Sequence, residues 1–317
     1  MAKYRDSLPQ MNGGLFLTDG GIETTLIFHE GLELPYFAAF DLMKDQAGQA
    51  ALRRYFSSHA SIARDNDCGF ILESPTWRAS SDWGAKLGYS DADLAEVNRQ
   101  SIALLLDLRR IFESERSPMV ISGCVGPRGD GYNPGAVMTA EEAQAYHAGQ
   151  IDVFAGTEAD MITAITMTNV PEAVGVTRAA QAAGMPVAVS FTVETDGTLP
   201  AGDTLKDAIK AVDAATDNGP AYFMINCAHP DHFDDALAAG ETWVKRIRGL
   251  RANASRLSHA ELDQATELDA GNPAELGQQY RALRSKLGTI TVMGGCCGTD
   301  HRHIEAICHA CTTAAAA

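Results

Sequence analysis

Two adjacent cysteines near the end of the chain follow a short strand-like run and are flanked by glycines. The segment reads Gly294-Gly295-Cys296-Cys297-Gly298, and a second apolar run, residues 221–226, ends in Cys227. Thiolates are ligands of borderline-soft metals, and a catalytic zinc ion usually has three protein ligands and one open position. The sequence therefore predicts that Cys227, Cys296 and Cys297 bind Zn²⁺ and leave its fourth position to a substrate.

The charge of such a site favours one kind of chemistry. Three thiolates carry three negative charges against two on the metal, so a bound water is acidified less than it is by three neutral histidines. A substrate thiol in the fourth position would instead lose its proton and remain nucleophilic at neutral pH. The flanking glycines allow consecutive side chains, which point to opposite faces of a regular strand, to reach one ion.

Composition excludes several classes of protein. The chain has 317 residues, 45% of them hydrophobic, and a formal net charge of −16. We expect no nucleic-acid partner, because phosphate contacts need a basic stripe and none is present. No run approaches the roughly 20 apolar residues of a membrane helix, and the N-terminus lacks the apolar core of a signal peptide. The sequence thus predicts a cytoplasmic protein whose seven cysteines are reduced thiols and metal ligands rather than a disulfide framework.

Short β-rich runs alternate with longer segments of helical period along the whole chain. The predicted strands are residues 15–19, 70–76, 119–123, 161–168, 186–192, 221–227, a weak one at 250–255, and 289–293. The predicted helices are residues 47–65, 91–113, 140–155, 172–183, 204–218, 231–248 and 272–287. Most of the strands lack polar alternation, as expected when helices cover both faces of a parallel sheet.

Eight strand-helix units in about 300 residues match the (β/α)8 TIM barrel in number and length. A doubly wound open sheet is the alternative, but no Gly-x-Gly-x-x-Gly follows the first strand. No linker or repeat divides the chain, so we expect one barrel domain over residues 1–312 and a disordered alanine-rich tail at 313–317.

Polar residues at the ends of the predicted strands are the candidates for substrate contact. Active sites of such barrels lie at the carboxyl ends of the strands, so these side chains should converge with the three cysteines at one mouth. The candidates are Asp19, Glu73, Thr76, Thr166, Thr192, Glu194 and Asn226. Purely local roles are the alternatives for two of them, a brace for the Gly20-Gly21 turn for Asp19 and loop hydrogen bonds for Asn226.

The cysteine motif resembles that of the zinc-dependent homocysteine S-methyltransferases, and the resemblance extends from about residue 16 to residue 304. Its strongest parts are residues 294–299 and Asn226-Cys227, and weaker matches in the same order are residues 19–21, 122–127, 189–192 and 271–273. The resemblance implies a (β/α)8 barrel with zinc on Cys227, Cys296 and Cys297. It also places Asp19 near the amino group of the thiol substrate, and we therefore take Asp19 and Asn226 as candidate catalytic residues.

One position departs from the family pattern. Where relatives usually have a glutamate at the end of the fourth strand, which helps to bind the ammonium of homocysteine, this chain has Ile165. Loss of a charge-assisted hydrogen bond removes roughly 1.5–3 kcal/mol of binding free energy, enough to change which thiol is preferred. Glu73 or Glu194 is the candidate to supply the missing carboxylate.

The predicted reaction is a direct displacement in which the thiolate attacks a methyl group on a small cationic donor, a sulfonium such as S-methylmethionine or a betaine. With homocysteine as the acceptor, the product is methionine. Trp77, Trp83, Tyr132 and Phe191 are candidates for cation-π contact with the donor. The predicted partners are therefore a small-molecule thiol and a methyl donor. A homo-oligomer is possible, although no heptad stripe indicates one.

Two other functions compete with this interpretation. Cys308 and Cys311 have Cys-x-x-Cys spacing and together with Cys296 and Cys297 could form a structural four-cysteine zinc site, although the period of residues 303–310 favours an ordinary terminal helix. A catalytically silent barrel that binds a thiol is the other alternative, for which Ile165 is the main argument. Three retained oxidisable thiols argue against it.

Overall fold

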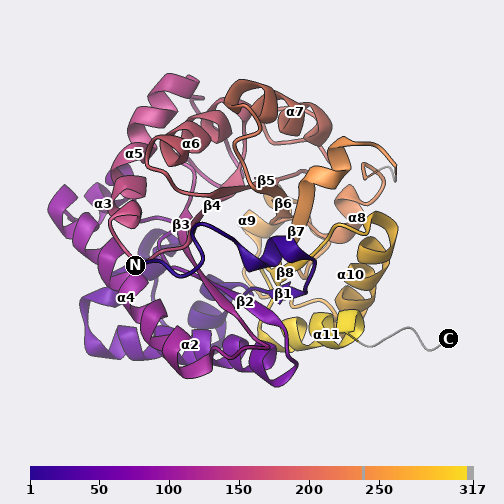
Figure 1. Ribbon diagram of the computed structural model, residues 1–317, viewed down its shortest axis with the longest axis horizontal. Coiled ribbons are helices and arrows are strands. Elements are labelled where there is room, and N and C mark those ends of the chain that lie inside the picture. The colour runs from indigo at the N-terminus through magenta and orange to yellow at the C-terminus, as the bar shows by residue number, and fades with distance from the viewer. Residues whose placement is uncertain (238–239, 313–317) are drawn as a thin grey trace.

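The computed structural model is a closed barrel of eight parallel strands surrounded by helices (Figure 1). It describes residues 1–237 and 240–312. The strands pair in sequence order, and β1 closes the ring by pairing with β8. They are β1 Phe16–Leu17, β2 Gly69–Glu73, β3 Met119–Val125, β4 Met161–Met167, β5 Val187–Thr192, β6 Tyr222–Asn226, β7 Ile247–Ala252 and β8 Val292–Gly295. The predicted TIM barrel is confirmed. The predicted tail, residues 313–317, lies outside the described residues.

Helices connect the strands and form the outer ring (Figure 1). The α-helices are α1 Ile22–Thr24, α2 Gln46–Asp65, α3 Ser81–Lys86, α4 Asp91–Phe112, α5 Ala140–Ala155, α6 Val170–Ala182, α7 Leu205–Thr216, α8 Pro230–Phe233, α9 His259–Gln264, α10 Pro273–Leu287 and α11 His301–Thr312. Short 3-10 or π-helical turns are η1 Pro9–Asn12, η2 Thr25–His29, η3 Pro35–Phe37, η4 Ala39–Lys44 and η5 Trp243–Arg246. Local sequence marks the start of several long helices, because capping boxes at Ser90 and Thr139 satisfy otherwise unpaired backbone N–H groups of α4 and α5.

The hydrophobic core has two parts. The larger lies between the strands and the helices, and the smaller fills the inside of the barrel with Leu8, Phe16, Ile71, Val120, Met161, Ala188, Tyr222, Met224 and Val292. The N-terminal segment covers the amino ends of the strands, where Arg5 donates to the backbone carbonyls of Ala155, Thr157 and Ala159. Access to the interior is therefore from the carboxyl ends, as in barrel enzymes generally.

Four predicted elements have different bounds in the structure. The predicted helix at residues 231–248 is only α8 and η5, because Gly240 has φ +94 and β7 already begins at Ile247. The predicted seventh and eighth strands at 250–255 and 289–293 are displaced by about three residues, since pairing aligns Gly249 with Val292 and Ala252 with Gly295. The first strand is reduced to two residues. None of the described helices is long and apolar enough to cross a membrane.

Candidate functional site

Cys227, Cys296 and Cys297 converge at the carboxyl ends of β6 and β8. Their three Sγ atoms lie within 4.8 Å of one another, and within the described residues no other group of three His, Cys, Asp or Glu side chains could bind a metal ion. The backbone fixes this placement, because the N–H of Cys227 donates to the carbonyl of Arg251 and the N–H of Cys296 donates to that of Ala252. Thiols far apart in sequence are thus held together by the β6–β7–β8 ladder.

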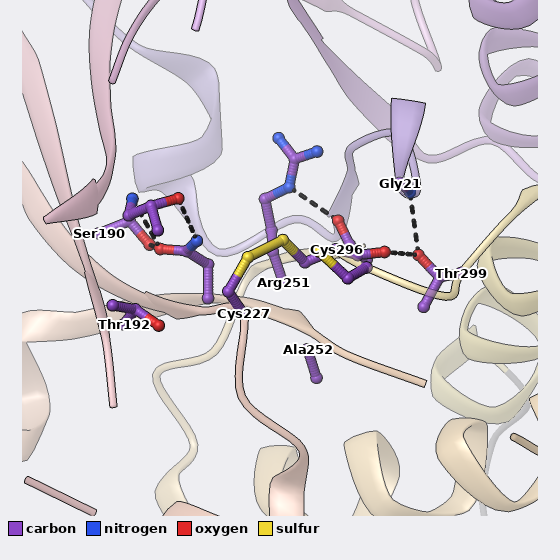
Figure 2. Close-up of a disulfide and its surroundings, with 12 residues drawn as sticks. Gly21, Ser190, Thr192, Cys227, Arg251, Ala252, Cys296 and Thr299 are labelled. Atoms are coloured by element: carbon purple, nitrogen blue, oxygen red, sulfur yellow. Dashed lines mark hydrogen bonds between the residues drawn. A yellow bond between two sulfur atoms is a disulfide. The ribbon is translucent and has the colours of Figure 1, made fainter. Parts of the chain in front are cut away.

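Cys227 and Cys296 are joined as a disulfide, with Cα atoms 5.4 Å apart (Figure 2). The sequence predicted reduced thiols, and for this pair that prediction was wrong. The physical reason is proximity, because side chains placed to share one metal ion are also within reach of each other. Cys297 is a free thiol. The Oη of Tyr132 lies 3.2 Å from its Sγ.

Glycine is required where the cysteine loop meets its neighbours. A Cβ at Gly294 would collide with the hydroxyl of Thr18 on the adjoining strand end, and Gly298 has φ +80, which favours glycine. The N–H of Gly298 donates to Thr24 Oγ1 (3.0 Å), and the N–H of Gly21 donates to the carbonyl of Thr299 (3.0 Å). The loops after β1 and β8 therefore form one unit beside the thiols.

A buried ion-pair cluster lies beside the thiols, and the sequence did not predict its central residue. Arg251 of β7 donates from Nη2 to Asp19 Oδ1 (2.8 Å) and from Nη1 to Glu73 Oε2, and its Nε donates to the carbonyl of Gly295 (3.1 Å). Tyr55 donates to the other oxygen of Asp19 (2.8 Å). Although burial alone would lower it, the pKa of Arg251 is raised by the charges of Asp19 and Glu73. Burial raises the pKa of Glu73. The available signal was an arginine within a predicted strand, which in the structure lies near the carboxyl end of β7, at the same level as the other candidates.

Asn226 and Thr166 form a second polar group. Asn226 is fully buried, and its Oδ1 accepts from the Thr166 N–H (3.0 Å) and from Ser190 Oγ (2.6 Å), while its Nδ2 donates to Thr166 Oγ1 (2.8 Å). Thr166 has φ +63, which these bonds sustain at the end of β4. Asn226 thus fixes β4 and β5 against β6, directly before Cys227.

A cavity of about 340 Å³ opens above these groups. Asp19, Glu73, Thr166 and the three cysteines line it, together with Arg251, Ile165, Trp77 and Tyr132. Thr76, Thr192, Glu194 and Asn226, which the sequence also placed at the mouth, are not among the lining residues, nor are Trp83 and Phe191. Thr76 donates to the carbonyl of Cys124 (2.8 Å) instead.

Thr192 and Glu194 contact His259, a residue that the sequence did not single out. Glu194 Oε1 lies 3.1 Å from His259 Nδ1, and Thr192 Oγ1 lies 3.4 Å from His259 Nε2, which is also 2.7 Å from the carbonyl of Cys227. Tyr132 stacks on the His259 ring at 4.1 Å between centroids. This chain of contacts positions Cys227 and Tyr132 from outside the cavity.

Comparison with known proteins identifies the family. Residues 16–311 match the family model described as homocysteine S-methyltransferase. The chain is 23% identical over 323 residues to homocysteine S-methyltransferase 4 of Zea mays, covering 94% of this chain and 90% of that protein. It is similar in fold to the homocysteine methyltransferase MmuM from Escherichia coli. The oxidised form of MmuM matches with a TM-score of 0.72 and 19% identity over 92% of this chain and 94% of that one. The metallated form matches with a TM-score of 0.71 and 19% identity over 94% of this chain and 96% of that one.

The family match spans the whole barrel and includes all three cysteines at its mouth. The chain belongs to the homocysteine S-methyltransferase family and is a methyltransferase.

Proposed function

We propose that this protein is a zinc-dependent S-methyltransferase that moves a methyl group from a small cationic donor to the thiol of homocysteine, giving methionine. The observation that carries the proposal is the convergence of the Cys227, Cys296 and Cys297 Sγ atoms within 4.8 Å at the floor of the cavity. Family membership supports the acceptor, because the family model is that of homocysteine S-methyltransferases.

The three thiols fit zinc. Sulfurs around a tetrahedral zinc ion with Zn–S bonds of about 2.3 Å lie about 3.8 Å apart, and the observed spread needs only small side-chain adjustments once the Cys227–Cys296 disulfide is reduced. The metallated form of E. coli MmuM supports this choice of site. Zinc bound there would lower the pKa of an incoming thiol, so that the thiolate is present near neutral pH.

The chain's own residues would align the two substrates. A thiol at the cysteines lies on the cavity floor, so in-line displacement requires the donor to approach from the mouth. Trp77, Phe28 and Phe37 line that side, and Phe28 and Phe37 are more than half exposed. Aromatic faces attract a sulfonium or quaternary ammonium group, so S-methylmethionine, another sulfonium or a betaine is the donor that we propose.

A second candidate is methyl transfer to a thiol other than homocysteine. The observation in its favour is that Ile165 lines the cavity with an apolar side chain, while Glu73 is bonded to Arg251 and Glu194 lies outside the lining. A barrel that binds such a thiol without turnover is the corresponding non-catalytic alternative.

The test uses reduced, zinc-loaded protein incubated with a panel of thiols and of sulfonium or betaine donors, with products followed by mass spectrometry. We expect methionine from homocysteine with at least one cationic donor. Methylation of another thiol alone would favour the second candidate, and zinc-replete protein without turnover across the panel would contradict methyl transfer.

A further inference from the structure

Glu23 lines the cavity with a carboxylate that has no ion-pair partner among the described residues. It belongs to α1, the short turn after β1, and lines the cavity together with the three cysteines. Asp19 and Glu73, which also line the cavity, bond to Arg251. No described residue forms an ion pair with Glu23, and only its own backbone N–H is directed at its carboxylate. Of Asp19, Glu23 and Glu73, Glu23 is therefore the carboxylate available to a cationic group of a ligand.

The fold fixes Glu23 relative to the thiols. Residues on both sides of it bond to the loop that carries Cys296 and Cys297, since Gly21 donates to Thr299 and Thr24 accepts from Gly298. Figure 2 shows the contact between Gly21 and Thr299 beside Cys296. Glu23 and Cys297 also line the same cavity. One small ligand can therefore contact both.

Burial raises the pKa of Glu23 to about 7, with a further contribution from Asp19 that Arg251 and Arg78 oppose. A carboxylate in this environment gains more from a neighbouring cation than one in water does, because water does not replace the lost solvation. Structural bracing does not explain the residue, since its carboxylate braces no other described residue.

We infer that Glu23 binds the ammonium group of an amino-acid thiol acceptor and thereby determines the preference of this site for such thiols. The inference rests on the proposed function. The acceptor is favoured over the donor as the source of the cation for a geometric reason: the ammonium of an amino-acid thiol is tethered to the sulfur at the floor, whereas in-line attack places the cationic centre of the donor toward the mouth. In this chain Glu23 takes the role of the ammonium-binding glutamate that relatives have at the position of Ile165.

The experiment compares L-homocysteine with 4-mercaptobutyrate, which has the same chain without the ammonium group. Binding of each thiol to reduced, zinc-loaded wild type and Glu23→Gln is measured by calorimetry, and zinc content is measured for both proteins to show that the site is intact. Glu33→Gln is the matched control, because Glu33 is exposed and lies outside the cavity lining.

We expect Glu23→Gln to weaken binding of homocysteine by roughly ten- to a hundredfold and to leave that of 4-mercaptobutyrate and the KM of the donor unchanged. Glu33→Gln should change none of these. Unchanged homocysteine affinity, equal weakening of both thiols, or a raised donor KM would each overturn the inference. A zinc-loaded wild type that binds neither thiol would instead contradict the proposed function.

Discussion

The barrel contains two groups of three cysteines whose surroundings are opposite. Cys227, Cys296 and Cys297 lie at strand ends with a cavity above them. Cys68, Cys308 and Cys311 lie where α11 packs against α2, and the Cys68 and Cys308 Sγ atoms are 3.9 Å apart. Both groups bring thiols together from distant parts of the sequence, although among the described residues only the first has three Sγ atoms within 4.8 Å of one another.

The surroundings of the two groups of cysteines differ as well. The second group belongs to the layer between strands and helices, where Cys68 and Cys308 are core residues and Cys311 packs against that core. Burial raises the pKa of Cys311 to about 11, and the cavity that gives a substrate access to the first group is not lined by any thiol of the second. The first group has an open side and glycine-flanked loops. A ligand set needs access as well as convergence, and the terminal helix that the period of residues 303–310 predicted is confirmed as α11.

Removal of a thiol from the first group should have the largest effect. We expect Cys297→Ala to lower the rate of methyl transfer by more than roughly a hundredfold. Even residues that only hydrogen-bond to metal ligands contribute roughly 10- to 100-fold to metal affinity or activity. Steady-state rates with the proposed acceptor and donor measure this. Activity close to wild type in Cys297→Ala would remove the functional difference between the two groups.

Arg251→Met tests the ion-pair cluster that accompanies only the first group. It leaves Asp19 and Glu73 buried without their partner, and loss of one partner of a buried ion pair costs roughly 3–5 kcal/mol. Urea unfolding should show this loss of stability. The combined variant Asp19→Asn, Glu73→Gln, Arg251→Met should recover much of it, and no recovery would show that packing rather than charge explains the loss.

Asp300 begins α11 and so connects the cysteine loop with the second group. Its carboxylate accepts from the Arg302 N–H (2.9 Å) and pairs with the Arg302 side chain. Although burial opposes it, hydrogen bonds from His303 and Arg302 lower its pKa. A carboxyl group whose pKa is lower in the folded than in the unfolded state stabilises the fold at pH values above its unfolded pKa. This contribution is lost as the pH falls through the folded pKa. Asp300→Asn should therefore cost about 1 kcal/mol at pH 7 and less at pH 3. An equal cost at both pH values would contradict this.

Cys308→Ala should have the smallest effect. The change removes one buried sulfur from the core, and we expect a loss of about 1 kcal/mol in the free energy of unfolding with unchanged methyl transfer. Thermal unfolding and activity assays on the same sample check both. A large loss of activity without unfolding would show that the second group takes part in function.

The sequence predicted the barrel and the three converging cysteines because both depend on local patterns, apolar strand runs and glycine-flanked thiols. The sequence did not predict which carboxylates form buried ion pairs. Arg251 meets Asp19 and Glu73 only when β1, β2 and β7 surround one barrel interior, and no spacing in the chain indicates that. Glu23 was missed for a related reason, since its isolation becomes visible only when the partners of its neighbours are known. The helix at 231–248 was wrong because Gly240 has φ +94, which a helix does not allow, and because β7 already begins at Ile247.

Zinc stoichiometry of reduced protein distinguishes the two groups of cysteines. We expect one equivalent of zinc per chain in the wild type and in Cys308→Ala, and none in Cys227→Ala. Zinc retained by Cys227→Ala and lost from Cys308→Ala would place the metal in the second group and contradict the catalytic site described above.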